Sequence, residues 1–77
     1  MNDNETKAIR AICDDCDELD GWGFTRPGHM VAALLKVFRS GEVAGGYIRD
    51  LMDKNVIDVD FRDDTVWVRP EIFEIYA

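Results

Sequence analysis

The strongest indication of the fold of this 77-residue chain lies between Ser40 and Arg69, in the stretch SGEVAGGYIRDLMDKNVIDVDFRDDTVWVR. Its first half predicts a helix, which Ser40 can cap and which ends at Lys54-Asn55, because Asn tolerates the left-handed conformation. Gly45-Gly46 lies in the middle of this helix, where glycine usually marks the close approach of another helix. The buried face that we expect for the helix consists of Val43, Tyr47, Leu51 and Met52.

The second half of the stretch predicts a β-hairpin. From residue 57 to residue 61 apolar side chains alternate with acids, so the period of the apolar pattern falls from 3.6 to 2. Residues 62–64 predict a turn and residues 65–69 the returning strand, which Pro70 ends. Trp67 alternates out of phase with the valines on either side of it, and we therefore expect it on the opposite face of the strand.

Two more helices are expected before this stretch. Apolar residues at the spacing i, i+3, i+4, i+7 predict the first helix, which glycines end at positions 21 and 23. Thr25 can cap the second helix and Pro27 suits its first turn. Residues 21–24 should form a loop, and residues 71–76 a short helical turn docked on the core. The first stripe is Ile9, Ile12, Cys13 and Cys16, and the second is Val31, Leu34, Leu35 and Phe38.

The order helix, helix, helix, hairpin resembles the winged-helix (winged helix-turn-helix) fold family over about residues 5–70. The resemblance lies mainly in residues 40–69, where a capped helix passes through a leucine-containing turn straight into the hairpin. It implies an α+β fold, namely a three-helix winged-helix-like domain with a C-terminal β-hairpin and a short terminal helical turn. Residues 1–77 would then form one winged-helix-like domain.

The composition excludes several classes of protein. With 16 acidic and 9 basic residues the net charge is -7, which opposes free-standing binding to nucleic acid because phosphates call for Lys and Arg. Apolar residues make up 47% of the chain, too many for a disordered acidic tail. No apolar run approaches the roughly 18–20 residues of a membrane span, and the polar segment 1–6 is no signal peptide. We therefore expect a cytoplasmic protein without membrane contact.

The acids form two blocks on either side of a basic middle. Residues 1–20 and 50–77 each carry a net charge of -5, whereas residues 21–49 carry +3. Blocks of like charge repel one another, so they indicate either a need for solubility or a partner with a basic surface. We identify both blocks as candidate partner-binding residues. They are Asp14, Asp15, Asp17, Glu18 and Asp20 in the first block, and Asp58, Asp60, Asp63 and Asp64 in the second.

Three aromatic residues, Trp22, Phe24 and Trp67, stand beside these acids. Core packing is the usual role of large aromatics in a small domain. Because Trp67 is expected to leave the core side of its strand, it suits a protein interface instead, where Trp is enriched among hot spots. We add Trp67 to the candidate partner-binding residues.

The winged-helix resemblance raises the question of DNA binding. In that family the third helix enters the major groove and the wing contacts the DNA. Here residues 42–53 carry three acids and one Arg, and residues 58–64 carry four acids and one Arg, so both surfaces would repel phosphates. Arg26, Lys36 and Arg39 could form a small basic patch on the second helix, which keeps DNA binding open as an alternative.

Nothing in the sequence indicates an enzyme, a cofactor or a metal site. The C-x-x-C pair Cys13 and Cys16 has no second pair, and with His29 it falls short of the four ligands of a structural zinc site. Both cysteines lie on the apolar stripe, which favours core packing. His29 has no nucleophile arranged with it, and there is no glycine-rich phosphate-binding motif. We expect no enzymatic activity, no cofactor and no metal.

These observations predict a non-enzymatic protein-binding module, a monomer or small homo-oligomer, whose partner is the basic surface of a nucleic-acid-binding protein. Carboxylates on a rigid scaffold can occupy sites built for phosphates. In size and charge the chain resembles small acidic phage-encoded inhibitors such as DNA-mimicking anti-CRISPR proteins, which implies inhibition of a host protein by charge mimicry and no direct contact with nucleic acid. Two alternatives stay open, a winged-helix transcriptional regulator that binds DNA as a dimer and an interaction subunit of a larger assembly.

Overall fold

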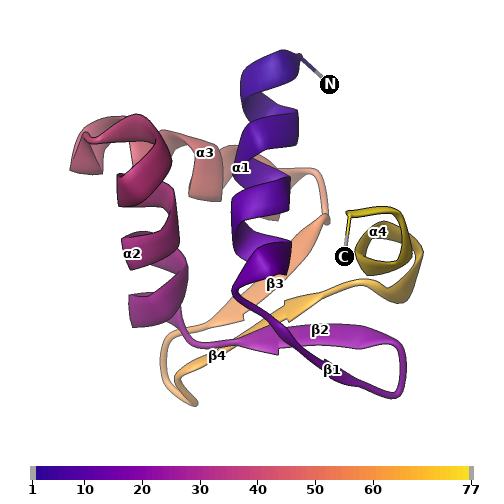
Figure 1. Cartoon of the computed structure of the whole chain (residues 1–77). Helices are drawn as coiled ribbons and strands as arrows, with labels where there is room; N and C mark the ends of the chain where they lie inside the picture. Colours follow the sequence, from indigo (N-terminus) through magenta and orange to yellow (C-terminus); the bar gives the residue numbers. More distant parts are fainter. Residues whose placement is uncertain (1, 77) are drawn as a thin grey trace.

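Eight helices and strands follow one another along residues 2–76, the part of the chain that the computed structural model describes (Figure 1). They are α1 (Asp3–Asp14), β1 (Asp17–Leu19), β2 (Trp22–Thr25), α2 (Pro27–Phe38), α3 (Gly41–Asp53), β3 (Ile57–Asp60), β4 (Thr65–Val68) and α4 (Pro70–Tyr76). The strands form one antiparallel sheet in the order β1-β2-β4-β3. The expected α+β class is confirmed, but this part of the chain holds four helices and four strands rather than three helices, a hairpin and a short helical turn. None of its helices is both long and apolar enough to cross a membrane.

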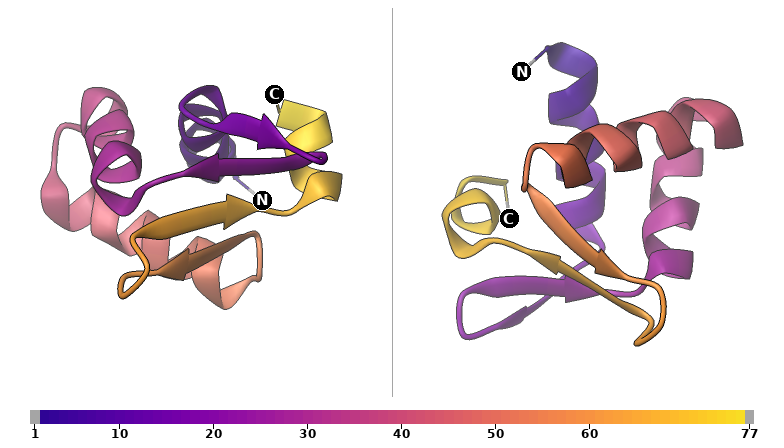
Figure 2. Two further views of the ribbon diagram at one scale, coloured as in Figure 1. Left: turned by 90° about the horizontal axis from the view of Figure 1, so that it is seen from below. Right: turned by 180° about the vertical axis from the view of Figure 1, so that it is seen from behind.

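The helices lie on one side of the sheet, as Figures 1 and 2 show, and no other described element covers the opposite side. We call that uncovered side the outer face. The core fills the space between the helices and the inner face of the sheet. Its largest fully buried side chains are Ile9, Ile12, Met30, Leu34, Leu51, Val66 and Val68. The residues of the outer face therefore do not belong to this core.

Helix α3 begins and ends as the sequence predicted, but the face that it buries agrees with the prediction only in part. The Ser40 hydroxyl accepts a hydrogen bond from the Val43 amide at 3.2 Å, and Asn55, beyond the helix end, has a φ of 59°. The predicted buried face is wrong in part, because Val43 is 44% exposed. The buried residues of α3 are Ala44, Ile48 and Leu51. These three residues have the spacing i, i+4, i+7 and form the stripe of α3 that packs on the core. In this orientation of the helix Val43 points toward solvent.

The two glycines inside α3 do not mark a close helix contact. A Cβ atom added at Gly45 or Gly46 would meet no heavy atom within 4 Å, so that expectation is wrong. The reason is again the rotation of the helix, which turns both positions toward solvent.

The first acid block does not continue the first helix. Helix α1 ends at Asp14, and residues 17–25 form the hairpin β1–β2 instead of a helix end and a loop. The turn between the strands is Asp20-Gly21, with φ values of 51° and 86°. Positive φ at both positions is typical of a type I′ turn, which Asp-Gly favours strongly. The acids from Asp17 onward therefore lie outside α1, whereas Asp14 and Asp15 stay at its C-terminal end, where acids oppose the helix dipole.

Thr25 joins α1 to the sheet instead of capping α2. Its hydroxyl donates a hydrogen bond to the Asp15 carboxylate at 2.8 Å, and Arg26 occupies the cap position of α2 without a side-chain bond to the helix. Pro27 lies in the first turn of α2, as predicted.

The predicted hairpin is confirmed as β3–β4, with one correction at its tip. Pairing ends where Asp60 meets Thr65, and residues 61–64 form the connecting loop. Phe61 lies in this loop and is 68% exposed, although the alternation of apolar residues with acids up to residue 61 predicted it on the strand. Asp64 closes the loop with a φ of 59°. The chain needs these four residues to reverse, so the strand ends before Phe61.

The C-terminal segment forms a full helix, α4, rather than a single turn. Phe73 anchors it and is 7% exposed, whereas Ile75, which lies in the segment expected to dock on the core, is 69% exposed. The Phe73 ring lies against Gly23 of β2, where an added Cβ atom would come within 2.5 Å of the ring carbon Cδ1. The close approach of the Phe73 ring to β2 therefore requires glycine at position 23.

An ion pair joins the start of α1 to the end of α3. The nearly buried carboxylate of Glu5 accepts a hydrogen bond from Lys54 Nζ. This bond lowers the pKa of Glu5 and raises the pKa of Lys54. The stabilisation is therefore present near neutral pH. It is lost when the pH falls through the lowered pKa of Glu5 or rises through the raised pKa of Lys54.

Candidate functional site

The outer face carries a row of side chains that runs across all four strands. Asp17 on β1 lies opposite Phe24 on β2. Phe24 in turn lies opposite Trp67 on β4, which lies opposite Asp58 on β3. Directly opposed residues of antiparallel strands point to the same face, and strands about 4.8 Å apart give the row a length of about 14 Å. Two aromatic rings thus lie between two carboxylates, one from each acid block.

Trp67 is the centre of an aromatic cluster on this face. Its ring centroid lies 4.8 Å from that of Phe24 and 6.2 Å from that of Trp22, with interplanar angles of 53° and 87°. The predicted alternation is confirmed, because Val66 and Val68 are fully buried on the inner face while Trp67 is half-buried on the outer one. Trp22 is 37% exposed, so part of the cluster stays accessible.

A hollow of about 530 Å³ opens at the tryptophan end of this cluster. We call it the outer-face hollow, and it is lined by Leu19, Asp20, Trp22, Asp58 and Trp67. Each part of the sheet contributes to it, since the first two residues come from β1 and its turn, the tryptophans from the two central strands, and Asp58 from the β3 edge. Its volume lies within the roughly 300–1,000 Å³ that is usual for ligand pockets.

Three acids from the two predicted blocks lie on the outer face. Asp17 belongs to the cross-strand row, Asp20 lines the hollow, and Asp58 does both. All three are exposed, and none makes a side-chain hydrogen bond or an ion pair within residues 2–76. The structure therefore brings together carboxylates that lie about 40 positions apart in the sequence.

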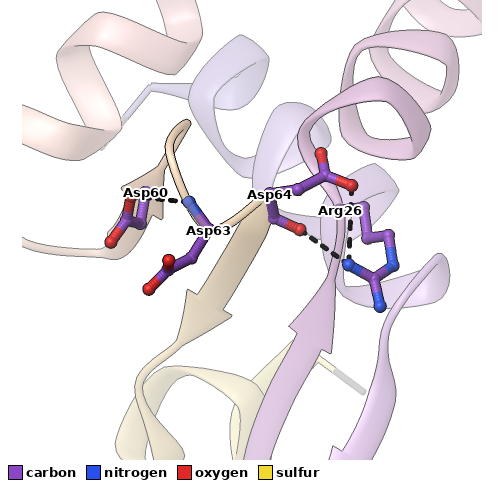
Figure 3. Close-up of polar contacts among 4 residues, drawn as sticks. All are labelled: Arg26, Asp60, Asp63 and Asp64. Atoms are coloured by element: carbon purple, nitrogen blue, oxygen red, sulfur yellow. Dashed lines mark hydrogen bonds and ion pairs between the residues drawn. The ribbon is translucent and has the colours of Figure 1, made fainter.

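The hairpin acids Asp60 and Asp64 have partners within the protein, which Figure 3 shows. The Asp60 carboxylate accepts hydrogen bonds from the backbone amides of Arg62 at 2.9 Å and Asp63 at 3.1 Å. Asp64 holds Arg26, whose Nη1 donates to the Asp64 carbonyl at 3.0 Å and lies 3.5 Å from its carboxylate. These two acids shape the turn between β3 and β4.

Two acids of the first block are also occupied by local contacts. Asp15 accepts the hydrogen bond from Thr25, and the Glu18 carboxylate accepts one from the Gly21 amide at 3.2 Å across the β1–β2 turn. The remaining predicted acids, Asp14 and Asp63, are exposed at the end of α1 and at the hairpin tip.

In the predicted basic patch on the second helix, Arg26 is engaged by contacts within the protein. The Arg26 guanidinium carbon lies 5.5 Å from the centre of the Phe24 ring, in addition to its contacts with Asp64. Lys36 and Arg39 are exposed at the far end of α2. Arg69, just beyond β4, donates from Nε to the Asn55 carbonyl at 2.6 Å. Arg26 and Arg69 are thus both engaged by other groups of the protein.

The cysteines of the C-x-x-C pair lie in and beside the core. Cys13 is 3% exposed and Cys16 is half-buried. Burial raises the pKa of Cys13 to about 11 and that of Cys16 to about 12, and neighbouring acids add to both increases. No group of three or more His, Cys, Asp or Glu within residues 2–76 is arranged to hold a metal ion. The thiols are therefore poor nucleophiles at neutral pH.

We expect both thiols to resist alkylation in the native protein. A free cysteine has a pKa of about 8.5, so a pKa near 11 lowers the thiolate fraction at pH 8 by roughly a hundredfold or more. Iodoacetamide labelling, followed by mass spectrometry, should be slower by at least that factor in native than in unfolded protein. The unfolded chain also releases its thiol protons from about pH 8.5, before the native protein does, so stability should fall as the pH rises above that value. Equal labelling rates in the two states would contradict this description.

The main feature that sequence reasoning missed is the β1–β2 hairpin. Its signal was present, since Asp20-Gly21 stands between Leu19 and Trp22 and predicts a two-residue hairpin turn. Because the hairpin was not predicted, Leu19 was not recognised as a surface residue. It is 50% exposed and lines the outer-face hollow.

Comparison of the chain with protein-family models, curated proteins and solved structures gave no match.

Proposed function

We propose that this protein is a non-enzymatic binding module whose outer face docks on a basic surface of another protein. The observation that carries the proposal is the cross-strand row in which Phe24 and Trp67 lie between Asp17 and Asp58. An aromatic centre with a charged rim is the usual plan of a protein interface. The aromatic rings would supply most of the affinity, and the carboxylates would speed association with a basic partner.

The proposed architecture is a winged-helix domain to which one strand has been added. The strand order β2-β4-β3 with helices α1, α2 and α3 supports this proposal, and β1 would then extend the sheet beyond β2. In such a domain α3 and the β3–β4 hairpin would face DNA. The exposed residues of α3 include Glu42, Asp50 and Asp53 against Arg49, which favours a protein partner over DNA.

The proposed partner surface is one that normally binds nucleic acid. Such surfaces present Lys and Arg for phosphates, and a rigid sheet with Asp17, Asp20 and Asp58 offers them carboxylates instead. Occupancy of that surface would exclude the nucleic acid. The proposed biological outcome is inhibition, as in the small phage-encoded inhibitors that the chain resembles in size and charge.

Neutralising the outer face tests this proposal. The immobilised protein would be used to capture nucleic-acid-binding proteins from a bacterial lysate, and their affinities would then be measured by biolayer interferometry. We expect the variant Asp17→Asn/Asp20→Asn/Asp58→Asn to bind the captured protein about tenfold more weakly, mainly through slower association, since three exposed ion pairs are lost. Binding by the unmodified protein should weaken as the salt concentration rises.

A second variant removes the same amount of charge elsewhere. Asp50→Asn/Asp53→Asn/Glu74→Gln also changes the net charge from -7 to -4, but its residues lie on α3 and α4. This variant should bind like the unmodified protein. Equal weakening by both variants would show that overall charge acts rather than the outer face, and unchanged binding by the first variant would refute the proposed site.

A further inference from the structure

The outer-face hollow combines two features that together select a cation. The rings of Trp22 and Trp67 meet at 87°, so the face of one ring lies beside the edge of the other. Aromatic faces attract cations, and indole does so most strongly. Asp20 in the β1–β2 turn and Asp58 on β3 line the same hollow, so two acidic residues stand beside the rings.

The opposite end of the aromatic cluster already holds a guanidinium group. There Arg26 lies over the Phe24 ring and contacts the carbonyl and carboxylate of Asp64. The tryptophan end offers larger rings and two carboxylates, and no Lys or Arg of residues 2–76 lines it. The two ends thus have the same chemistry, but the protein's own arginine fills only one of them.

We propose that the outer-face hollow accepts an arginine side chain of the partner. This inference rests on the proposed function, because it names the residue through which the basic partner surface engages the outer face. The guanidinium stacks on an indole ring and donates hydrogen bonds to the two aspartates, while its methylene stem packs against Leu19. Arginine is preferred over lysine because its planar group is less strongly hydrated and stacks on aromatic rings.

A titration with blocked tripeptides tests the inference directly. The chain has two tryptophans and both line the hollow, so each indole N–H signal in a two-dimensional NMR spectrum of the full chain reports this site. Acetyl-Gly-Arg-Gly-amide should shift both signals saturably, with a dissociation constant on the order of 1 mM. The lysine tripeptide should bind at least about threefold more weakly. The citrulline tripeptide, which has the shape of arginine without its charge, should give no saturation.

The variant Asp20→Asn/Asp58→Asn should weaken binding of the arginine tripeptide about fivefold or more, and the control Asp50→Asn/Asp53→Asn should leave it unchanged. Citrulline or lysine binding as tightly as arginine would overturn the inference, as would unchanged binding by the first variant. If the arginine tripeptide shifts neither indole signal while the captured partner still requires Asp17, Asp20 and Asp58, the arginine site is refuted and the proposed function stands. If neither the tripeptide nor any partner depends on these residues, both are refuted.

Discussion

Replacing Trp67 with Ala is expected to weaken binding of the captured partner by at least about thirtyfold, because buried tryptophans at interface centres contribute 2 kcal/mol or more. Trp67 touches both other aromatic rings of the outer face and lines the hollow. Its loss therefore removes the contact surface and the support of Trp22 together. The effect is measured by biolayer interferometry, at a temperature at which circular dichroism shows that the variant is folded.

The control for this prediction is Leu35→Ala on α2. Leu35 has the same exposed fraction as Trp22, 37%, but lies on a helix away from the outer face. Its truncation should change the affinity less than twofold. A larger loss from Leu35→Ala than from Trp67→Ala would place the interface on α2 and contradict the outer-face account.

The largest effect on stability is expected from Gly23→Ala. The new methyl group would meet the Phe73 ring at 2.5 Å, so the ring or α4 must move. Overpacking of this kind costs about 1–3 kcal/mol in the free energy of unfolding. Urea denaturation followed by circular dichroism measures the change.

Two further variants assign the cause of that loss. Gly45→Ala places the same methyl group in open space within a helix and should raise the stability by about 0.5–1 kcal/mol. Adding Phe73→Leu to Gly23→Ala should cost less than the sum of the two single changes, because the smaller side chain leaves room for the methyl group. Additive losses would mean that Gly23 does not act through Phe73.

Strong local signals predicted the second half of the fold. Ser40 caps α3 and Asn55 follows its end in the left-handed conformation, and the change of period after α3 predicted the β3–β4 hairpin. These features depend on residues next to one another in the chain, so the sequence contains them. The face that α3 buries depends on its contacts with other elements, and the apolar spacing alone could not choose between Val43 and Ala44.

The candidate site was predicted in its residue types but not in its arrangement. The sequence alone predicted the acid blocks and the face of the strand on which Trp67 lies. The row from Asp17 to Asp58 depends instead on the pairing of β2 with β4, which lie about 40 residues apart. Pairing over such a distance leaves no local pattern. The roles of Asp60 and Asp64 in the turn were hidden for a different reason, because a structural carboxylate and a free one look alike in a sequence.

Competition with nucleic acid measures whether the outer face occupies a nucleic-acid-binding surface of the partner. The captured protein would be loaded with its fluorescently labelled nucleic acid, and the anisotropy of the label would be followed as this protein is added. We expect increasing amounts of the unmodified protein to displace the nucleic acid completely, and the Trp67→Ala variant to need at least about thirtyfold higher concentrations for the same displacement. Formation of a ternary complex that keeps the nucleic acid bound would contradict the claim that the outer face occupies a nucleic-acid-binding surface.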